Sequence, residues 1–415
     1  MGNTPNIRFK GFTDDWEQRK LGDVLVSLQN NTLSRADLSN ESGVAKNVHY
    51  GDVLIKFGEV LDAGKEQLPM ITDESVLSKY KASFLQNGDV IVADTAEDST
   101  VGKCSEIAGL NGDIVLSGLH TIPYRPVEKF ATGYLGYYLN SGAYHNQLIP
   151  LMQGIKVTSI SKSAMQGTDI VYPKSVKEQA MIGNCFQSLD HLITLHQRKC
   201  DETKKLKKFM LQKMFPKKDA KKPEIRFAGF TDDWEQRKFG DVFKEYSEKG
   251  HTELPALAII QGGGTVKREN SDRNLMYDKT NLSSYKMVRK DDFIVHLRSF
   301  EGGLEKSSLD GIISPAYHTF HSDIADSRFY YPYFRSYEFI KHKLVSHVYG
   351  IRDGRSIDID GMKTIEIPYT SLEEQRKIGD YLDDLDHLIT LHQRKCDELK
   401  EFKKYMLQNM FPQKG

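Results

Sequence analysis

The chain of 415 residues contains one unit of sequence written twice. The first copy opens at Ile7 with IRFKGFTDDWEQRKLGDV, and the second opens 218 residues later, at Ile225, with IRFAGFTDDWEQRKFGDV. Each copy closes on a near-identical segment, LDHLITLHQRKCDE, which begins at Leu189 and again 196 residues later at Leu385. A repeat of this length limits the number and kind of domains that the chain can form. We therefore predict two related units rather than one core.

The middles of the two copies have diverged on a common frame. GDVIV at Gly88 resembles DDFIV at Asp291, and Gly154-Ile-Lys156 resembles Gly350-Ile-Arg352. Near-identical ends favour repeated docking surfaces for two copies of one partner, while the diverged middles do related but different jobs. A duplication without a symmetric partner is the alternative, and it is less favoured because near-identity is confined to the ends.

The closing segments have the pattern of long amphipathic helices. Seam residues recur every three or four positions, which is close to a heptad repeat. They are Ile182, Phe186, Leu189, Ile193, His196, Cys200, Thr203, Leu206 and Met210 in the first copy, and Ile378, Leu382, Leu385, Ile389, His392, Cys396, Leu399, Phe402 and Met406 in the second. Ser175 and Ser371 are the predicted N-caps. Each helix of roughly 40 residues would be about 60 Å long, and the two seams are expected to pack together as an antiparallel pair.

The middles have a mixed α/β pattern. Short β-prone runs lie at residues 53–55, 90–92, 114–116, 256–260 and 293–295, and helices with an aromatic face are predicted at 134–139 and 334–340. The expected organisation is a globular domain at 1–174, a long helix at 175–216, a linker at 217–224, a second globular domain at 225–370 and a second long helix at 371–415.

Composition excludes several functional classes. Lys plus Arg and Asp plus Glu each total 57, so a uniformly basic binder is excluded although local basic faces are not. No apolar run is long enough to cross a bilayer. The four cysteines form no CxxC pair, so we expect small buried hydrophobic residues, no metal site and a reducing cytoplasm. Phosphate-loop, HExxH, GxSxG and [ND]PP[FY] motifs are absent, and the sequence predicts a protein that is not an enzyme.

In order and duplication, these features resemble the specificity subunits of type I restriction–modification enzymes. The resemblance spans nearly the whole chain. It is carried by residues 16–24 and 234–242, GDVIV at 88–92, the I-x-x-P turns at 170–173 and 365–368, and the Glu-Gln pairs at 178–179 and 374–375.

The resemblance implies a fold and a set of partners. The fold would be two α/β target recognition domains separated by two long antiparallel coiled-coil helices, with a pseudo-two-fold internal repeat. Each domain would read one half of an asymmetric bipartite site in double-stranded DNA. Two methyltransferase subunits would dock on the helices, restriction subunits would join through that core, and no membrane would be involved. S-adenosylmethionine, ATP and Mg²⁺ would be bound by the partner subunits, so no cofactor is expected in this chain.

Candidate DNA contacts are basic, amide or hydroxyl residues in loop-like stretches of both middles. Arginine is the favoured reader of guanine in a groove, while lysine and arginine on phosphates only position the protein. For each residue taken singly, ordinary solvated surface is the simpler interpretation, and the set is favoured only with the family resemblance. The candidates are Lys56, Thr95, Lys103, Gln153, Lys156 and Thr158 in the first copy, and Lys267, Arg268, Arg273, Asn274, Arg298, Ser299, Arg352 and Arg355 in the second.

Two other functions stay open at this stage. One is an enzyme that modifies DNA by itself, against which the missing motifs count. The other is a scaffold that bridges two partner copies without reading DNA. The scaffold predicts that charge reversal at Arg298, Arg352 and Arg355 leaves activity unchanged.

Overall fold

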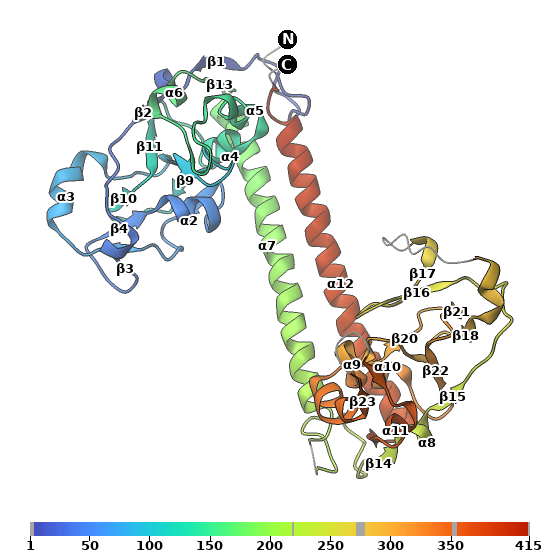
Figure 1. The fold of residues 1–415 in the computed structure, drawn as a ribbon. Coiled ribbons are helices and arrows are strands. Elements are labelled where there is room, and N and C mark those ends of the chain that lie inside the picture. The colour runs from blue at the N-terminus through green and yellow to red at the C-terminus, as the bar shows by residue number, and fades with distance from the viewer. Residues whose placement is uncertain (1–3, 218–219, 271–278, 351–354, 414–415) are drawn as a thin grey trace. The chain divides into compact units, whose positions relative to one another are not determined.

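The computed structural model describes residues 4–217, 220–270, 279–350 and 355–413, with the side chains of 279–281 left out (Figure 1). The chain forms two compact units. The first unit contains Met1–His196 together with Arg394–Gly415, and the second contains Gln197–Gln393. Each unit therefore combines the globular part of one repeat with a piece of the other repeat's closing helix.

The first unit is built on two main sheets. One has the strand order β2-β11-β7-β9-β5, in which only the β5–β9 pair is parallel, and the other has the order β10-β4-β6-β3. Two further pairs are β1–β13 and β8–β12. The strands are β1 Glu17–Lys20, β2 Leu25–Ser27, β3 Leu38–Ser39, β4 Ala45–Val48, β5 Val60–Asp62, β6 Met70–Ile71, β7 Val90–Ala93, β8 Thr95–Ala96, β9 Cys104–Ala108, β10 Val115–Ser117, β11 Thr121–Pro126, β12 Thr158–Ser159 and β13 Asp169–Tyr172.

Short helices surround these sheets. They are α1 Leu21–Val24, α2 Tyr50–Ile55, α3 Ser75–Tyr80, α4 Tyr134–Asn140, α5 Gly142–His145 and α6 Lys162–Gln166. Helix α4 buries every residue from Tyr134 to Leu139, which confirms the predicted aromatic helix. Its ring systems pack in the core rather than on a surface.

The second unit repeats the central part of this design. Its main sheet has the order β15-β22-β19-β20, joined by the pairs β14–β25, β16–β17, β18–β21 and β23–β24. The strands are β14 Glu235–Lys238, β15 Lys244–Tyr246, β16 Leu257–Ile260, β17 Gly264–Lys267, β18 Lys286–Val288, β19 Phe293–Val295, β20 Glu305–Lys306, β21 Gly311–Ile313, β22 His318–His321, β23 Val348–Tyr349, β24 Ser356–Ile357 and β25 Glu366–Tyr369. Its short helices are α8 Phe239–Val242, α9 Ser299–Gly302, α10 Ser327–Phe334 and α11 Ile359–Lys363, with a π-helical segment at Glu338–Leu344.

The two closing segments form long helices. Helix α7 spans Val176–Lys213 and α12 spans Leu372–Asn409, 38 residues each. The hydroxyl of Ser175 accepts a hydrogen bond from Glu178 N at 3.3 Å, and that of Ser371 accepts one from Glu374 N at 3.3 Å. Both predicted N-caps are therefore confirmed, because they satisfy an amide that the first turn leaves without a helical partner.

In the first unit, the beginning of α7 packs against the end of α12. Lys403 Nζ donates to Asp190 Oδ1 at 2.6 Å, and the thiol of Cys396 lies 3.9 Å from the carbonyl oxygen of Ile193. Later residues of α12 thus meet earlier residues of α7. The two helices run antiparallel here, as predicted.

The second unit makes the same contacts with the helices exchanged. Lys207 Nζ donates to Asp386 Oδ1 at 2.5 Å, and the thiol of Cys200 lies 3.7 Å from the carbonyl oxygen of Ile389. Each residue stands 196 positions from its counterpart in the first unit. Cys200 and Cys396 are fully buried, as expected of small hydrophobic residues, and the cysteines are free thiols.

Each core is completed by the end of the other repeat's helix. In the first unit, the Phe411 ring lies 5.4 Å from that of Tyr138 and 6.4 Å from that of Trp16. In the second, the Phe215 ring lies 4.9 Å from that of Phe329, with Trp234 also in contact. Both helix ends are buried, so the Met-Phe-Pro segments act as core residues as well as helix stops.

The motifs that open each copy hold the globular region to the start of its long helix. Arg8 Nε donates to Glu178 Oε1 at 2.7 Å, and Arg226 Nε donates to Glu374 Oε1 at 2.6 Å. Both carboxylates are 1% exposed. The shared motifs thus encode buried ion pairs of the frame, which explains why they are alike in both copies.

Three local predictions are wrong. Residues 53–55 belong to α2, not to a strand, because His49 Nδ1 accepts from Gly51 N at 3.2 Å and caps a helix. The predicted helix at 334–340 is interrupted after α10, where Ser336 Oγ accepts from Phe339 N at 3.2 Å and opens the π-helical segment. The predicted seam also includes Leu206 and Phe402, which are exposed. A straight helix drifts by about 20° per heptad from a 3.5-residue repeat, so this part of the stripe has left the seam.

Candidate nucleic-acid interface

In the first unit, a short β arm gathers three of the predicted contacts. Strand β8 pairs antiparallel with β12, which places Ser159 opposite Thr95, and Gln153 forms an isolated bridge with Ser159. Thr95 therefore lies close to Gln153 and Thr158, which come much later in the sequence. We call residues 153–159 the first arm.

The tip of the first arm requires glycine. Gly154 has φ +116°, and a Cβ at this position would lie 2.0 Å from the carbonyl oxygen of Val157. A side chain would thus collide with backbone, and positive φ is also unfavourable for other residues. The turn leaves Ile155 and Lys156 exposed, so the Lys156 ammonium is free to meet a phosphate.

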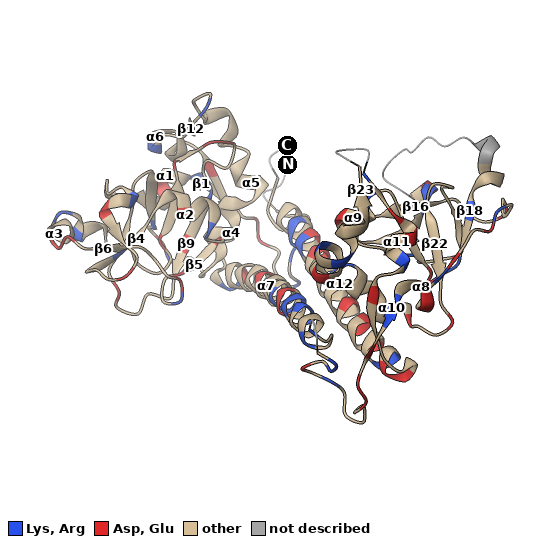
Figure 2. Ribbon diagram, turned by 60° about the horizontal axis from the view of Figure 1, so that its bottom comes forward, with Lys and Arg blue, Asp and Glu red and all other residues tan. Residues whose placement is uncertain are grey.

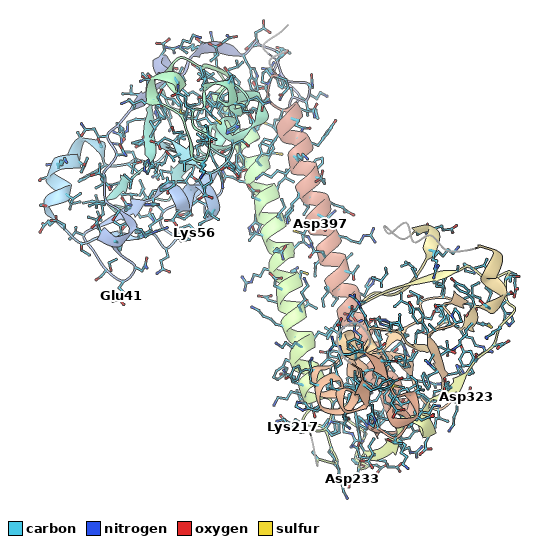
Figure 3. All side chains as sticks on the ribbon, in the orientation of Figure 1. Glu41, Lys56, Lys217, Asp233, Asp323 and Asp397 are labelled. Atoms are coloured by element: carbon cyan, nitrogen blue, oxygen red, sulfur yellow. The ribbon has the colours of Figure 1, made fainter. Side chains whose placement is uncertain are left out.

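The other two predicted lysines of this unit have their side chains near the end of α2, Lys56 as its C-cap and Lys103 from the turn before β9. Lys103 Nζ donates to Leu54 O at 2.7 Å, and burial lowers the pKa of Lys103. Lys56 is exposed, as Figure 3 shows, although its Nζ donates to Gln67 O at 2.5 Å. Lys56 can reach a phosphate by giving up a surface hydrogen bond, whereas Lys103 is half-buried and bound to a backbone carbonyl oxygen.

The second unit has a corresponding arm, which is formed by β23 and β24. Tyr349 lies opposite Ser356, as Gln153 lies opposite Ser159 in the first arm. The Arg355 guanidinium lies 4.5 Å from the centre of the Phe300 ring and 3.6 Å from the Glu301 carboxylate. Both arms thus pack against the segment that follows the third strand of the main sheet.

That segment in the second unit is α9, and it separates two neighbouring candidates. Arg298 is exposed at the N-cap of α9. Ser299 is fully buried, and its hydroxyl accepts from His296 N at 2.9 Å. Ser299 has no surface to offer a base, so we correct its assignment to a residue that shapes the turn.

The remaining candidates lie elsewhere. Lys267 is exposed at the end of β17, opposite Leu257, and Arg268 beside it donates to the carbonyl oxygen of Leu257 at 3.3 Å and lies 5.5 Å from the Tyr285 ring centre. Neither belongs to the second arm. Three candidates fall outside the described residues, namely Arg273, Asn274 and Arg352.

Sequence reasoning missed a feature beside the first arm. The turn between β10 and β11 places His120 at φ 55° next to Thr95, and a hollow of about 500 Å³ opens beside it. Gln29, Asn30, Lys79, Asp94 and Lys162 contribute to the lining of this hollow. Histidine, like asparagine and aspartate, is enriched among non-glycine residues at positive φ, but this preference does not mark one histidine of the sequence in particular.

The long helices carry apolar residues that their pairing does not cover. The exposed apolar positions occur at equivalent places in both helices, 196 residues apart. These pairs are Leu192 and Leu388, Leu206 and Phe402, and Phe209 and Tyr405. The helices also carry both basic and acidic residues along their length (Figure 2). Repeated apolar positions on a helix surface are typical of a protein interface.

Comparison with known proteins identifies the family. The family model described as Type I restriction modification DNA specificity domain matches residues 13–205 and again residues 231–401. The chain belongs to this family. The two matches fall on the two copies of the repeat.

Relatives and one solved structure agree with the assignment. A Methanocaldococcus jannaschii protein that carries the name MjaX specificity subunit of a type I restriction enzyme is 23% identical over 421 residues, covering 95% of this chain and 92% of that protein. The MjaVIII specificity subunit from the same organism is 26% identical over 277 residues, 61% of this chain and 64% of that protein. The crystal structure of a type I restriction–modification S subunit from M. genitalium matches with TM-score 0.59 and 13% identity, over 99% of this chain and 100% of that one. The predicted fold class is thereby confirmed.

The described residues contain neither a membrane-spanning helix nor a cluster of metal ligands. Across the described ranges, no helix is both long and apolar enough to span a bilayer. Within the same residues, no group of three or more His, Cys, Asp or Glu side chains is arranged to hold a metal ion.

Proposed function

We propose that this chain is the non-catalytic DNA-recognition subunit of a type I restriction–modification complex. Each unit reads one half of an asymmetric bipartite site in double-stranded DNA. Helices α7 and α12 dock two methyltransferase subunits, and restriction subunits join through that core. S-adenosylmethionine, ATP and Mg²⁺ act on those partner subunits.

The pair of arms is the observation that carries the proposal. Both arms occupy the same place in the frame, yet Gln153 and Thr158 stand in the first arm where the second has Tyr349 and Arg355. Side chains that differ on a common scaffold suit two half-sites of different sequence. Exposed Lys156 and the other surface cations supply phosphate contacts, which position a protein on DNA without reading its sequence.

The repeated apolar positions on the long helices support partner docking. Two near-identical surfaces fit two copies of the same subunit, because each copy makes the same contacts. Arg8–Glu178 and Arg226–Glu374 fix each recognition region to its helix. A rigid connection of this kind lets docking on the helix define where each half-site is methylated.

The experiment is to express the full chain with its methyltransferase partner and to sequence the methylated positions of the host genome. We expect a split motif with one methylated adenine in each half. Replacing residues 25–174 by the corresponding region of another family member should then change one half of the motif and leave the other unchanged.

The alternatives give different results. If methylation were independent of this chain, or if exchanging 25–174 altered both halves or neither, the proposal would be wrong. A scaffold that does not read DNA would keep its motif after charge reversal at Arg298 and Arg355. The proposal expects one half of the motif to be lost or changed in that double variant.

A further inference from the structure

The His120 backbone is held in a conformation that costs energy. His120 has φ 55°, and Asp291 is the other non-glycine residue with positive φ among those described. Asp291 occupies the place of Gly88, which has φ +92°, so a turn that both repeats share explains it. No such shared turn explains His120. Strained residues of this kind persist only where their surroundings hold them, and they cluster at functional sites.

Buried polar groups hold the turn that carries His120. The hydroxyls of Ser117 and Thr121 lie 2.6 Å apart, and Thr121 Oγ1 donates to Gly118 O at 2.5 Å. Asn31 N donates to Ser117 O at 2.8 Å, and Asn30 Nδ2 donates to Gly118 O at 3.1 Å. Ser117, Thr121 and Asn31 are at most 2% exposed. The turn is therefore a rigid support.

This support presents the imidazole to solvent. The His120 side chain is 47% exposed. Its Nδ1 lies 3.4 Å from Thr95 Oγ1 and 3.5 Å from Asp94 Oδ1, and the Tyr50 ring meets it edge-on with centroids 5.3 Å apart. Within the described residues Nε2 has no hydrogen-bond partner. One ring nitrogen thus orients the imidazole, and the other is left for a ligand.

Polar groups that suit a nucleic acid form part of the lining of the hollow beside this turn, together with the carboxylate of Asp94 and apolar side chains. Thr121, next to His120, lines it together with Gln29 and Asn30. Lys79 and Lys162 also line it and are exposed, so two ammonium groups flank the amides. Ammonium groups bind phosphates, while amides and imidazoles hydrogen-bond to base edges.

We propose that His120 is a specificity-determining residue, which reads one base pair of the half-site through Nε2. This inference rests on the proposed function and adds a reading group of the first unit to the side chains of the first arm. Thr95, already placed beside the first arm, orients the imidazole through Nδ1 together with Asp94. A reader on a rigid element discriminates well, because little entropy is lost when it binds.

The test is the variant His120→Gly in the full chain, expressed with the methyltransferase partner. Glycine accepts φ 55° without strain, so the imidazole is removed while the turn is preserved. We expect one position in one half of the methylated motif to lose about tenfold in discrimination, which is typical of one lost base contact. The other half should be unchanged. Asp291→Gly is the matched control, since it relieves a positive φ in the second unit and should leave both halves unchanged.

A second variant guards against an indirect effect of the turn. Asn tolerates positive φ and favours adenine, so His120→Asn should shift the preferred base at the same position. An unchanged motif in both variants, with the wild-type motif split as expected, would overturn this inference and leave the proposed function standing. A wild-type complex with no split motif would instead refute the proposed function.

Discussion

The two units bury a carboxylate at the same place and neutralise it differently. In the first unit, Arg125 Nη2 donates to Asp89 Oδ2 at 2.7 Å, and Asp89 is 1% exposed. In the second, the equivalent Asp292 is 3% exposed and lies 2.5 Å from His321 Nδ1. An arginine is always charged, whereas a histidine titrates near neutral pH. The position of the buried carboxylate is thus the same in both copies, whereas the residue that pairs with it differs between them.

A second pair of buried carboxylates differs in the same way. Glu305 of the second unit accepts from Arg335 Nη1 at 2.7 Å. Glu106 of the first unit accepts from Gly133 N at 2.6 Å and Gly136 N at 3.0 Å, and burial raises its pKa to about 7. The first unit therefore has a buried carboxyl that is held by backbone amides and titrates near neutral pH, whereas Glu305, on the corresponding strand of the second unit, is held in an ion pair. Duplicated frames can diverge in their response to pH while keeping the same fold.

The largest expected effect comes from truncating Phe411, whose ring fills the core of the first unit. Phe411→Ala removes a ring that is 1% exposed in the core of the first unit, so this unit should lose about 4 kcal/mol of unfolding free energy. Phe215→Ala should destabilise the second unit in the same way. Hydrogen–deuterium exchange can follow β7 and β19 separately. Equal loss of protection in both strands after Phe411→Ala would contradict the division into two units.

The buried ion pairs of the frame come next. Glu374→Ala leaves Arg226 without its carboxylate and also removes the acceptor of Trp234 Nε1, at 3.1 Å. We expect a loss of about 3 kcal/mol in the second unit, since removing one member of a buried pair strands the other. Glu178→Ala should cost the first unit less, because Trp16 Nε1 donates to no group within the described structure. Urea unfolding followed by exchange of the same two strands measures both values, and a larger loss for Glu178→Ala would reverse the comparison.

Features with local, repeated sequence signals can be predicted from the sequence, whereas features that depend on tertiary packing cannot. The N-caps at Ser175 and Ser371 and the long helices can be predicted because their signals are local and repeated. The run at 53–55 has β propensity but forms part of a helix, because the cap that His49 provides outweighs that propensity. Among the candidate contacts, the recurrence of Gly154-Ile-Lys156 in the second copy indicates a shared position, but it does not predict the strand pairing that forms the arm. The burial of Ser299 cannot be predicted from the sequence, because it depends on the packing of α9.

The comparison of Glu106 with Glu305 can be tested by pH. The folded pKa of Glu106, about 7, lies above the ordinary 4.5, so its contribution to stability is complete below pH 4.5 and is lost as pH rises through 7. The first unit should lose about 3 kcal/mol over this window, at 1.36 kcal/mol per pKa unit. Glu106→Gln should flatten the dependence, since an amide cannot ionise. Hydrogen–deuterium exchange at β7 between pH 5 and 8 measures the stability of the first unit. If stability falls with pH as steeply in Glu106→Gln as in the wild type, Glu106 is not the cause.

The smallest expected effect distinguishes His321 from Arg125. The Asp292 carboxylate raises the pKa of His321 above its ordinary 6.5, so the stability that this pair contributes is present below pH 6.5 and is lost as pH rises through the folded pKa. The imidazole is 41% exposed, so solvent screening should keep the loss under about 1 kcal/mol. His296, whose pKa burial lowers to about 4, titrates below this range. His321→Arg should make the second unit as insensitive as the Asp89–Arg125 pair between pH 7 and 9. Hydrogen–deuterium exchange at β19 between pH 7 and 9 measures this loss of stability. If the loss persists in His321→Arg, another group of the second unit is responsible.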